Sequence, residues 1–258
     1  MKIASWNVNS LKVRLPHLEQ WLKDAAPDVL GLQELKLEDP AFPHDAIAAA
    51  GYPARAVSGQ KTYNGVALLA RQPIDDVTIG IPGFEDPQRR VIAGTVGGIR
   101  VVDLYVVNGE AVGSDKYAYK LRWLDALTGW LKTELQRHPR MVVLGDFNIA
   151  PDDRDVHDPA AWHEQVLCST AERAALAGIL GLGFTDSFRL HQADGGHYSW
   201  WDYRQAAFRR NLGLRIDLVL VSDALKPHVR AAGIDREPRR WERPSDHAPV
   251  WVEIDPAA

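Results

Sequence analysis

The sequence has little sulfur and no long apolar stretch. Cys168 is the only cysteine among 258 residues, which excludes an internal disulfide framework and every metal site of the Cys-x-x-Cys type. No apolar run approaches the 18 or more residues of a membrane span. Residues 1–10 carry neither the apolar segment nor the cleavage pattern of a secretory signal. We therefore expect a cytoplasmic protein with no membrane partner.

Charge of one sign is also not in excess. The 30 basic and 34 acidic residues give a formal net charge of −4, so no global basic field indicates nucleic acid. Hydrophobic residues make up 46% and charged residues 25%, which is ordinary for a globular protein. The length allows one or two domains. Because no linker, low-complexity tract or repeat interrupts the chain, we expect a single domain over residues 1–258.

One segment departs from this balance. From Arg204 to Arg243 there are ten basic and five acidic residues, and aromatic residues lie in and just before this segment. A solvated surface explains the pattern if it is taken alone. A contact region for a nucleic-acid backbone is the alternative, because basic residues neutralise phosphates and aromatic faces stack on bases, but the pattern alone favours it less.

Several familiar catalytic motifs are missing. The chain contains no GxSxG, HExxH, GxxxxGK[ST] or GxGxxG pattern. Serine-based acyl transfer, zinc proteolysis, P-loop nucleotide hydrolysis and dinucleotide redox chemistry therefore lose their strongest sequence signals.

Short apolar runs alternate with helical patterns along the whole chain. The patterns predict helices that contain Leu15–Leu22, from about Lys116 to Arg137, and over Ala171–Leu180. They predict strands over Lys2–Asn7, Asp28–Gln33, Gly65–Ala70, Val91–Val96, Arg100–Val107, Met141–Gly145, Ile216–Val221 and Pro249–Ile254. Strands mixed with helices at this length favour a layered α/β domain.

Polar residues gather at the ends of these predicted strands. Each of them alone is typical of a turn or a solvated strand end. Together they favour a site, because ligands in layered α/β folds bind outside strand ends. The residues are Asn7, Glu34, Asp146, Asn148, Asp217, Asp246 and His247.

The chemistry of this set suggests phosphodiester hydrolysis. A hard oxygen ligand such as Glu34 suits Mg²⁺, which takes one or two carboxylates together with water and substrate phosphate. His247 is suited to binding a phosphate oxygen or transferring a proton, and it then needs a carboxylate to orient it. Its neighbour Asp246 is poorly placed for this on an extended segment, so we expect a distant residue such as Asp217.

Eight motifs in this order resemble the exonuclease III family, the abasic-site endonucleases and 3′→5′ exodeoxyribonucleases of the endonuclease/exonuclease/phosphatase superfamily. The resemblance extends from Lys2 to about Ile254. The motifs are SWNVN at 5–9, LGLQELK at 30–36, YNGVA at 63–67, YVVNG at 105–109, GDFNIA at 145–150, YSWWDY at 198–203, LRID at 214–217 and PSDHAP at 244–249.

The resemblance implies a deoxyribonuclease I-like four-layer α/β sandwich, in which two packed mixed sheets are flanked by helices. It also implies a Mg²⁺-dependent DNA-repair phosphodiesterase, with Mn²⁺ able to substitute. Its activities are those of the family, namely abasic-site incision, 3′→5′ exonuclease and removal of 3′ blocking groups. The implied partner is duplex DNA with abasic sites, nicks or recessed 3′ ends, and we expect a monomer.

The resemblance further assigns roles to individual residues. Glu34 matches the principal metal ligand, helped by Asn9. Asp146 matches the residue that activates or orients the attacking water, positioned by Asn7. Tyr105 and Asn148 match groups that hold the scissile phosphate. Asp217 and His247 match a hydrogen-bonded pair, and Asp246 matches an acidic residue at a second metal position. The implied metal-binding set is Glu34, Asn9, Asp146, Asn148, Asp246 and His247.

Substrate binding is assigned partly by the resemblance and partly by position. The resemblance marks Tyr63, Asn108, Trp200 and Leu214, while Phe208 is added because it lies in the same aromatic and basic stretch. We expect Trp200, Phe208 and Leu214 to line a pocket for an abasic sugar.

Three positions depart from the family pattern. Val107 stands where a proline is common, Asn9 where some members have an aspartate, and Leu214 where some have a tryptophan. These departures leave the balance of activities open.

Two other functions are compatible with the fold. A phospholipid or phosphoinositide phosphoesterase is disfavoured by the basic, aromatic stretch at 198–243 and by the missing secretion signal. A catalytically silent DNA-binding module would be expected to have lost ligands, and every strand-end residue named above is present.

Overall fold

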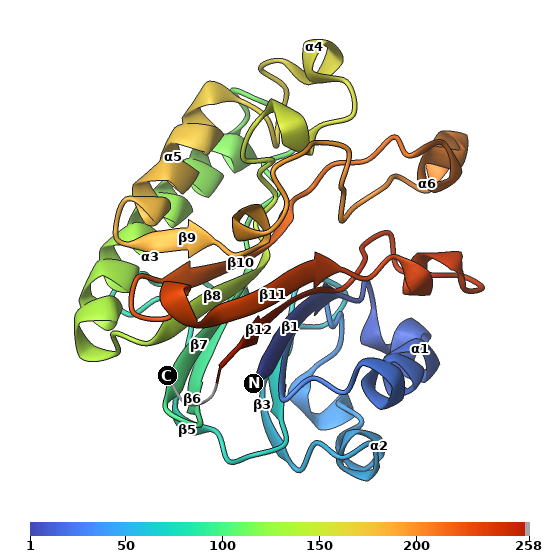
Figure 1. Cartoon of the computed structure of the whole chain (residues 1–258), viewed down its shortest axis with the longest axis vertical. Coiled ribbons are helices and arrows are strands. Elements are labelled where there is room, and N and C mark those ends of the chain that lie inside the picture. Colours follow the sequence, from blue (N-terminus) through green and yellow to red (C-terminus); the bar gives the residue numbers. More distant parts are fainter. Residues whose placement is uncertain (256–258) are drawn as a thin grey trace.

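The chain forms two β-sheets packed face to face between helices (Figure 1). The computed structural model describes residues 1–255, and within them each sheet has six strands. Sheet A has the order β11 (Val229–Ile234), β12 (Val250–Ile254), β1 (Lys2–Asn7), β2 (Val29–Gln33), β4 (Val66–Ala70) and β3 (Ala54–Ser58). Sheet B has the order β5 (Asp75–Ile79), β6 (Val91–Val96), β7 (Ile99–Tyr105), β8 (Met141–Asp146), β10 (Asp217–Ser222) and β9 (Phe184–Asp186).

Both sheets are mixed. β1 and β2 run parallel, as do β7 and β8, while the other pairs are antiparallel. Strands from the two ends of the chain are neighbours, because β1 pairs with β12 through Lys2 and Glu253. The eight predicted strands are confirmed within two residues at each end. Four strands were missed by the sequence patterns, namely β3, β5, β9 and β11.

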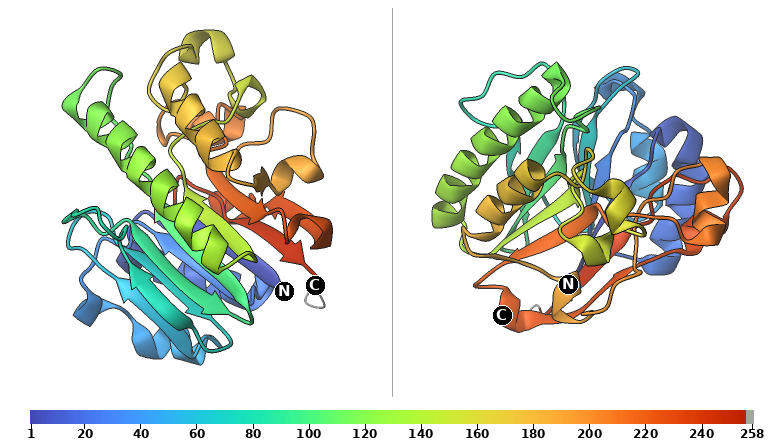
Figure 2. Two further views of the ribbon diagram at one scale, coloured as in Figure 1. Left: turned by 90° about the vertical axis from the view of Figure 1, so that its left-hand side faces the viewer. Right: turned by 90° about the horizontal axis from the view of Figure 1, so that it is seen from above.

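Helices cover the outer faces of both sheets (Figure 2). α1 and α2 lie on the side of sheet A, and α3 and α5 lie on the side of sheet B. The helices are α1 (Leu11–Ala25), α2 (His44–Ala49), α3 (Asp115–Arg137), α4 (Pro159–Trp162), α5 (Thr170–Leu180) and α6 (Ala207–Arg210). The expected four-layer sandwich is thus confirmed. Among the described residues, no helix combines the length and apolarity that crossing a bilayer requires.

The long helices start where the sequence supplies a cap. The Ser114 side chain accepts a hydrogen bond from the Tyr117 amide, which stabilises the start of α3. Ser169 and Glu172 form a reciprocal capping box at the start of α5. The apolar face of α3, which includes Trp123 and Leu127, then packs on sheet B.

Alternating side chains divide the core into layers. In β8, Val143 faces the helices on sheet B, while Val142 and Leu144 face the other sheet. In β2, Leu30 faces the α1 side and Val29 faces inward. Successive side chains of a strand point to opposite faces, so a strand with both faces buried reads as a continuous apolar run. This explains why the central strands were predictable.

The space between the sheets changes character along the strands. At one end the inward positions are apolar, as Ile3, Val101 and Val142 are. Two residues further on, Ser5 and Asp103 are polar and fully buried. The last inward positions of β1, β7 and β8, together with the first of β10, carry polar side chains at one end of the sandwich. These side chains are Asn7, Tyr105, Asp146 and Asp217.

A buried carboxyl group lies at the middle of this gradient. The Gln33 amide donates to Asp103 Oδ1 at 2.5 Å and to Ser5 Oγ at 3.0 Å. Gln33 Oε1 and Asp103 Oδ2 are both buried and have no hydrogen-bond partner. Burial raises the pKa of Asp103 well above its usual value, although the Gln33 amide opposes this. The sheets approach closely here, since a Cβ on Gly31 would lie 2.5 Å from Leu144 Cδ1.

We therefore predict that Asp103 makes stability depend on pH. Because the pKa of Asp103 is higher in the folded state, the folded protein binds the proton more tightly, and stability falls as pH rises above about 4. Asp103→Asn keeps the shape and removes the titration. We expect it to raise the free energy of unfolding at pH 8 by about 1 kcal/mol or more, since a tenfold change in proton affinity is worth about 1.4 kcal/mol.

Urea unfolding at pH 5 and pH 8 measures this effect. The exposed Asp125 on α3 provides the control, and Asp125→Asn should leave the pH dependence of wild type unchanged. If Asp103→Asn has the same dependence on pH as wild type, Asp103 is not held neutral in the folded protein.

Candidate active site

The strand-end residues converge because neighbouring strands end together. Asn7 at the end of β1 pairs with Gln33 at the end of β2. Glu34, the next residue after Gln33, therefore lies beside Asn7. In sheet B, Asp146 is paired with both Tyr105 and Asp217. The packing of the two sheets then places the Asn7 and Glu34 end of sheet A against the Asp146 end of sheet B.

One amide joins the two sheets at this point. Asn7 Nδ2 donates to Glu34 Oε1 and to Asp146 Oδ2, each at 2.9 Å. The side-chain oxygen of Asn7, Oδ1, accepts a hydrogen bond from the backbone amide of Asn9 at 3.0 Å. Asn7 and Asp146 are both buried. The Asn7 side chain therefore fixes the separation of two carboxylates from different sheets.

Glu34 is held in an unusual backbone conformation. Its φ is 55°, and that of Lys36 is also 55°, a region that non-glycine residues seldom occupy. The segment is fixed by backbone hydrogen bonds from Leu35 to Gly65 and from Lys36 to Asn64. Strain of this kind concentrates at functional sites, where the surrounding structure maintains it.

The Lys36 ammonium group shows that this position attracts a cation. It lies 2.9 Å from Glu34 Oε2 and 2.5 Å from Asn9 Oδ1. These two oxygens are the donors that the sequence assigned to a metal. The oxygen-rich donor set thus suits a hard cation.

His247 is oriented by Asp217, as expected. His247 Nδ1 lies 2.9 Å from Asp217 Oδ2, which also accepts from Ser199 Oγ at 2.7 Å. The other ring nitrogen, Nε2, lies 3.7 Å from Asp146 Oδ2. Burial by itself lowers the pKa of His247, but the charges of Asp217 and Asp146 outweigh it and raise the pKa to about 10. The raised pKa favours the protonated imidazole when no metal ion is bound.

Asp146 is buried, and Tyr105 lies beside it at a partly buried position. Burial raises the pKa of Asp146 to about 7, with the charge of His247 opposing it and the charges of Asp217 and Glu34 adding to it. Burial, and then the charges of Glu34 and Asp146, raise the pKa of Tyr105 well above its usual value. Tyr105 thus stays a neutral donor, and its hydroxyl is hydrogen-bonded to Glu34.

Two asparagines form one wall of the site. The backbone amide of Asn148 donates to Asp146 Oδ1 at 2.9 Å, and Asn148 Nδ2 donates to Val106 O at 2.9 Å. Asn108 Nδ2 donates to Asn148 Oδ1 at 3.2 Å. Phe147, between Asp146 and Asn148, points into the core as expected.

Asp246 lies on the opposite side of the cluster. It accepts from Asn9 Nδ2 at 2.9 Å through Oδ1 and from Trp200 Nε1 at 3.0 Å through Oδ2. Trp200 exchanges backbone hydrogen bonds with Leu214 and lines a hollow of about 430 Å³. Leu214 is fully buried and packs in the same apolar cluster as Trp200, but contrary to expectation it does not itself line this hollow.

Phe208 does not join the other two residues of the expected sugar pocket. It packs edge-on against Trp201 at 5.0 Å between ring centroids, in a separate cluster. Its ring lies 4.9 Å from the guanidinium carbon of Arg239. Phe208 was assigned to the pocket because it is close to Trp200 and Leu214 in the sequence. That assignment is wrong, because the short helix α6 turns its side chain toward Trp201. Tyr63, another expected substrate contact, is 67% exposed.

The metal-binding set expected from the sequence is divided in the structure. Glu34, Asp146 and His247 place ligand atoms within 4.8 Å of one another, so this cluster could hold a metal ion. Asn9 and Asp246 lie together beside Lys36 and Glu34. Asn148 instead uses its side-chain oxygen for Asn108 and one N–H for Val106, which leaves its second N–H for another acceptor.

Some residues that shape the site were not recognised in the sequence. Ser199 holds Asp217, and Ser245 donates to Asn7 O at 2.7 Å and accepts the His247 amide at 3.2 Å. Both lie inside motifs that were used only as markers of resemblance. Only Lys36 offered a positional signal, because it follows Glu34 by two residues.

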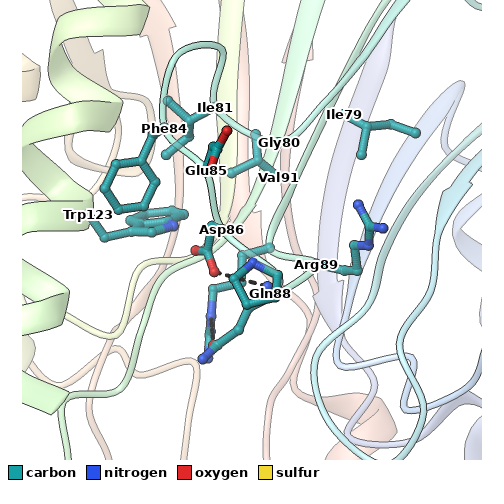
Figure 3. Close-up of a pocket in the computed structure, with 12 residues that line it drawn as sticks. Ile79, Gly80, Ile81, Phe84, Glu85, Asp86, Gln88, Arg89, Val91 and Trp123 are labelled. Atoms are coloured by element: carbon teal, nitrogen blue, oxygen red, sulfur yellow. Dashed lines mark hydrogen bonds between the residues drawn. The ribbon is translucent and has the colours of Figure 1, made fainter.

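Another hollow borders the site at Arg90, which lines it and whose guanidinium carbon lies 4.7 Å from the centroid of the Tyr105 ring. A cavity of about 570 Å³ is formed by the loop between β5 and β6 and by Trp123 of α3 (Figure 3). Phe84 and Ile81 face Trp123 there, while Asp86 accepts hydrogen bonds from Tyr119 and from the Gln88 amide. None of the strand-end carboxylates lines it.

Comparisons with known proteins agree with this geometry. The family model described as "Endonuclease/Exonuclease/phosphatase family" matches residues 4–247. The chain is 36% identical to exodeoxyribonuclease III of Haemophilus influenzae, over 98% of this chain and 100% of that protein.

Solved structures agree as well. The 3′ phosphatase NExo from Neisseria, bound to a product DNA hairpin, is 52% identical with a TM-score of 0.97 and 99% coverage of both chains. An AP endonuclease from Archaeoglobus fulgidus is 36% identical with a TM-score of 0.94, again with 99% coverage of both chains. The match over nearly the whole chain and the arrangement of its strand-end residues lead to one conclusion: the protein belongs to the endonuclease/exonuclease/phosphatase family.

Proposed function

We propose that this protein is a Mg²⁺-dependent phosphodiesterase of DNA repair that acts on duplex DNA at abasic sites, nicks or 3′ ends. The observation that carries the proposal is the linked series Glu34, Asn7, Asp146, His247 and Asp217, which combines a cation site with an oriented imidazolium. The similarity to exodeoxyribonuclease III and to AP endonucleases supports DNA as the substrate.

The oxygens of Glu34 and Asn9 fit a magnesium ion, because the Lys36 ammonium already lies against both of them. Asp246, which accepts a hydrogen bond from Asn9, would add a further oxygen donor. When bound, Mg²⁺, or Mn²⁺ in its place, supplies Lewis-acid polarisation of the phosphoryl group and stabilises the leaving oxygen. This chain's residues then bind and orient the substrate and transfer the proton.

Asp146 is suited to accept the proton of the attacking water. Burial raises its pKa above the usual value of a carboxyl group, and a more basic carboxylate accepts a proton more readily. Asn7 fixes one of its oxygens, and the Asn148 amide fixes the other. His247 cannot act as the base while it is protonated, so we assign it to binding a phosphate oxygen.

The remaining polar donors are placed to hold the phosphate. Tyr105 stays protonated because of its raised pKa, and the amides of Asn108 and Asn148 lie on the adjacent wall. Donors fixed in advance around a developing charge stabilise a transition state without rearranging. Residues of both sheets contribute to this arrangement, so we treat the whole chain as one catalytic domain.

The substrate is DNA in this proposal, and the hollow beside Trp200 receives its damaged sugar or terminal nucleotide. The Neisseria structure is described as a 3′ phosphatase, which adds 3′-phosphate removal to the activities to be tested. We further propose that the protein acts as a monomer in the cytoplasm.

One set of assays tests the proposal. The protein is incubated with an abasic duplex, a recessed-end duplex and a nicked duplex carrying a 3′-phosphate, each with Mg²⁺ and with EDTA. We expect Mg²⁺-dependent turnover of at least one of them. Turnover of a phospholipid or phosphoinositide with none of the DNA substrates would replace the proposal with a lipid phosphoesterase.

Glu34→Gln tests the metal site. This change keeps the shape of the side chain and removes its charge, so we expect turnover at low Mg²⁺ to fall by about 10²-fold, with partial recovery at high Mg²⁺. A Mg²⁺ titration of the rate measures it, with Glu85→Gln, at an exposed position in the loop between β5 and β6, as the control. An unchanged Mg²⁺ dependence would show that Glu34 is not a ligand.

Asp217→Asn and His247→Ala test the Asp–His pair. Each should lower kcat by about 10²–10⁴-fold, and the double variant should lower it little further, because residues that act as a unit are not additive. Single-turnover rates at saturating Mg²⁺ provide the comparison. Losses that multiply in the double variant would mean that the two residues act independently.

Trp200→Ala and Leu214→Gly test damage recognition. A baseless sugar leaves the duplex at lower cost than an intact nucleotide, so a fitted pocket discriminates between them. We expect the ratio of abasic to intact-strand incision to fall in both variants. Phe208→Ala is the matched control, because Phe208 lies in the separate cluster and should lower the melting temperature alone. An unchanged ratio in all three variants would make Trp200 and Leu214 purely structural.

A further inference from the structure

A buried ion pair lies directly behind the asparagine wall. Lys120 of α3 and Glu172 of α5 are both completely buried and lie 2.5 Å apart. The Lys120 ammonium also donates to Asn148 O at 2.7 Å and to Asn108 O at 3.1 Å. Its three donors are therefore fully used, two of them on the backbone of the two asparagines.

The carboxylate partner is itself fixed. Glu172 Oε1 accepts the Leu167 amide at 3.0 Å, and Oε2 accepts Ser169 Oγ at 2.6 Å and the Ser169 amide at 3.1 Å. Ser169 Oγ also lies 2.7 Å from the Tyr117 hydroxyl of α3. The ammonium is thus anchored to the ends of two helices that belong to the scaffold.

The loop after β7 packs tightly on the lysine stem. Gly109 has a φ of 96°, and a Cβ there would approach Lys120 Cδ to 3.1 Å. The loop is therefore seated on the side chain as well as bonded to its ammonium group.

Stability alone does not account for such a pair. Removing two charges from water costs free energy that their mutual attraction often fails to recover. Proteins in which apolar residues of similar size replace a buried ion pair are often as stable as the original or more stable. A buried cation that binds two backbone carbonyls does, however, set the distance between the loops that carry them. The loops in question bear Asn108 and Asn148, whose side chains contact each other at 3.2 Å.

We propose that Lys120 is a positioning residue, which joins the loops after β7 and β8 so that Asn108 and Asn148 present their amides to the same phosphate group. The role of the two amides rests on the proposed function, whereas the joining of the loops does not. Misplacement of a substrate-binding group by about 1 Å can cost about 10²-fold in rate.

A second buried ion pair provides a matched control. Arg100 of β7 lies 2.7 Å from Glu134 of α3, and both side chains are almost fully buried. Its other hydrogen bonds go to Asp76 O, to Thr78 Oγ1 and to Thr95 Oγ1. This pair also joins α3 to sheet B and contacts neither asparagine.

The experiment compares the removal of the two pairs. In Lys120→Met/Glu172→Gln we expect amide hydrogen exchange of residues 106–110 and 147–150 to rise by about tenfold or more and kcat to fall by about 10²-fold. In Arg100→Met/Glu134→Gln both quantities should stay within about twofold of wild type, even if its melting temperature falls as much as that of Lys120→Met/Glu172→Gln. If the double variant fails to fold, Lys120→Gln gives the same comparison.

Coupling to Asn108 gives a readout that a purely structural role would not change. Asn108→Ala should lower kcat in the wild type and have little further effect once Lys120 and Glu172 are replaced. Unchanged exchange of the two loops overturns the proposal whatever the substrate is. If the loops loosen while wild type cleaves no DNA, the positioning role stands and the proposed function fails.

Discussion

Face-to-face packing of two sheets is the constraint on which the site depends. Packed sheets lie about 10 Å apart, so each inward side chain must be apolar, small or hydrogen-bonded to the other sheet. Gly31 shows how little space is available, because Leu144 and Asp103 occupy the place of a side chain there. At the end of the sandwich the same constraint forces Asn7 and Asp146 into direct contact. The geometry of the site is therefore a property of the sheet interface rather than of flexible loops.

Dry surroundings then determine the charge states. Carboxylates that cannot reach water need partners, and the structure supplies the Asn7 amide, the Lys36 ammonium and the His247 imidazolium. Where compensation is incomplete, the carboxyl group binds its proton more tightly, as the raised pKa values of Asp103 and Asp146 indicate. The same low-polarity environment strengthens any interaction with an incoming anion. The burial that penalises these groups is thus also what makes them effective.

The sequence was informative where physical signals are local. Central strands with two buried faces and the 3.6-residue periodicity of α3 were readable, and so were the polar residues that follow the strands. Edge strands such as β5 were missed because they are short and partly exposed and lack an apolar run. The distant pairing of Asp217 with His247 was inferred from chemical need. Lys120 and Ser199 gave no such signal, because their partners are set by tertiary packing, and Phe208 was misplaced for the same reason.

The pairing of β1 with β12 has a consequence for biosynthesis. Ser245 and Asn7 are hydrogen-bonded across a separation of 238 positions, and His247 lies in the same late segment. Contacts of such long range close slowly, since loop entropy must be overcome before they form. A growing chain cannot assemble the Asp–His pair beside Asn7 until this segment has left the ribosome. The nascent polypeptide therefore lacks a complete site until Ser245 and His247 can pack against β1.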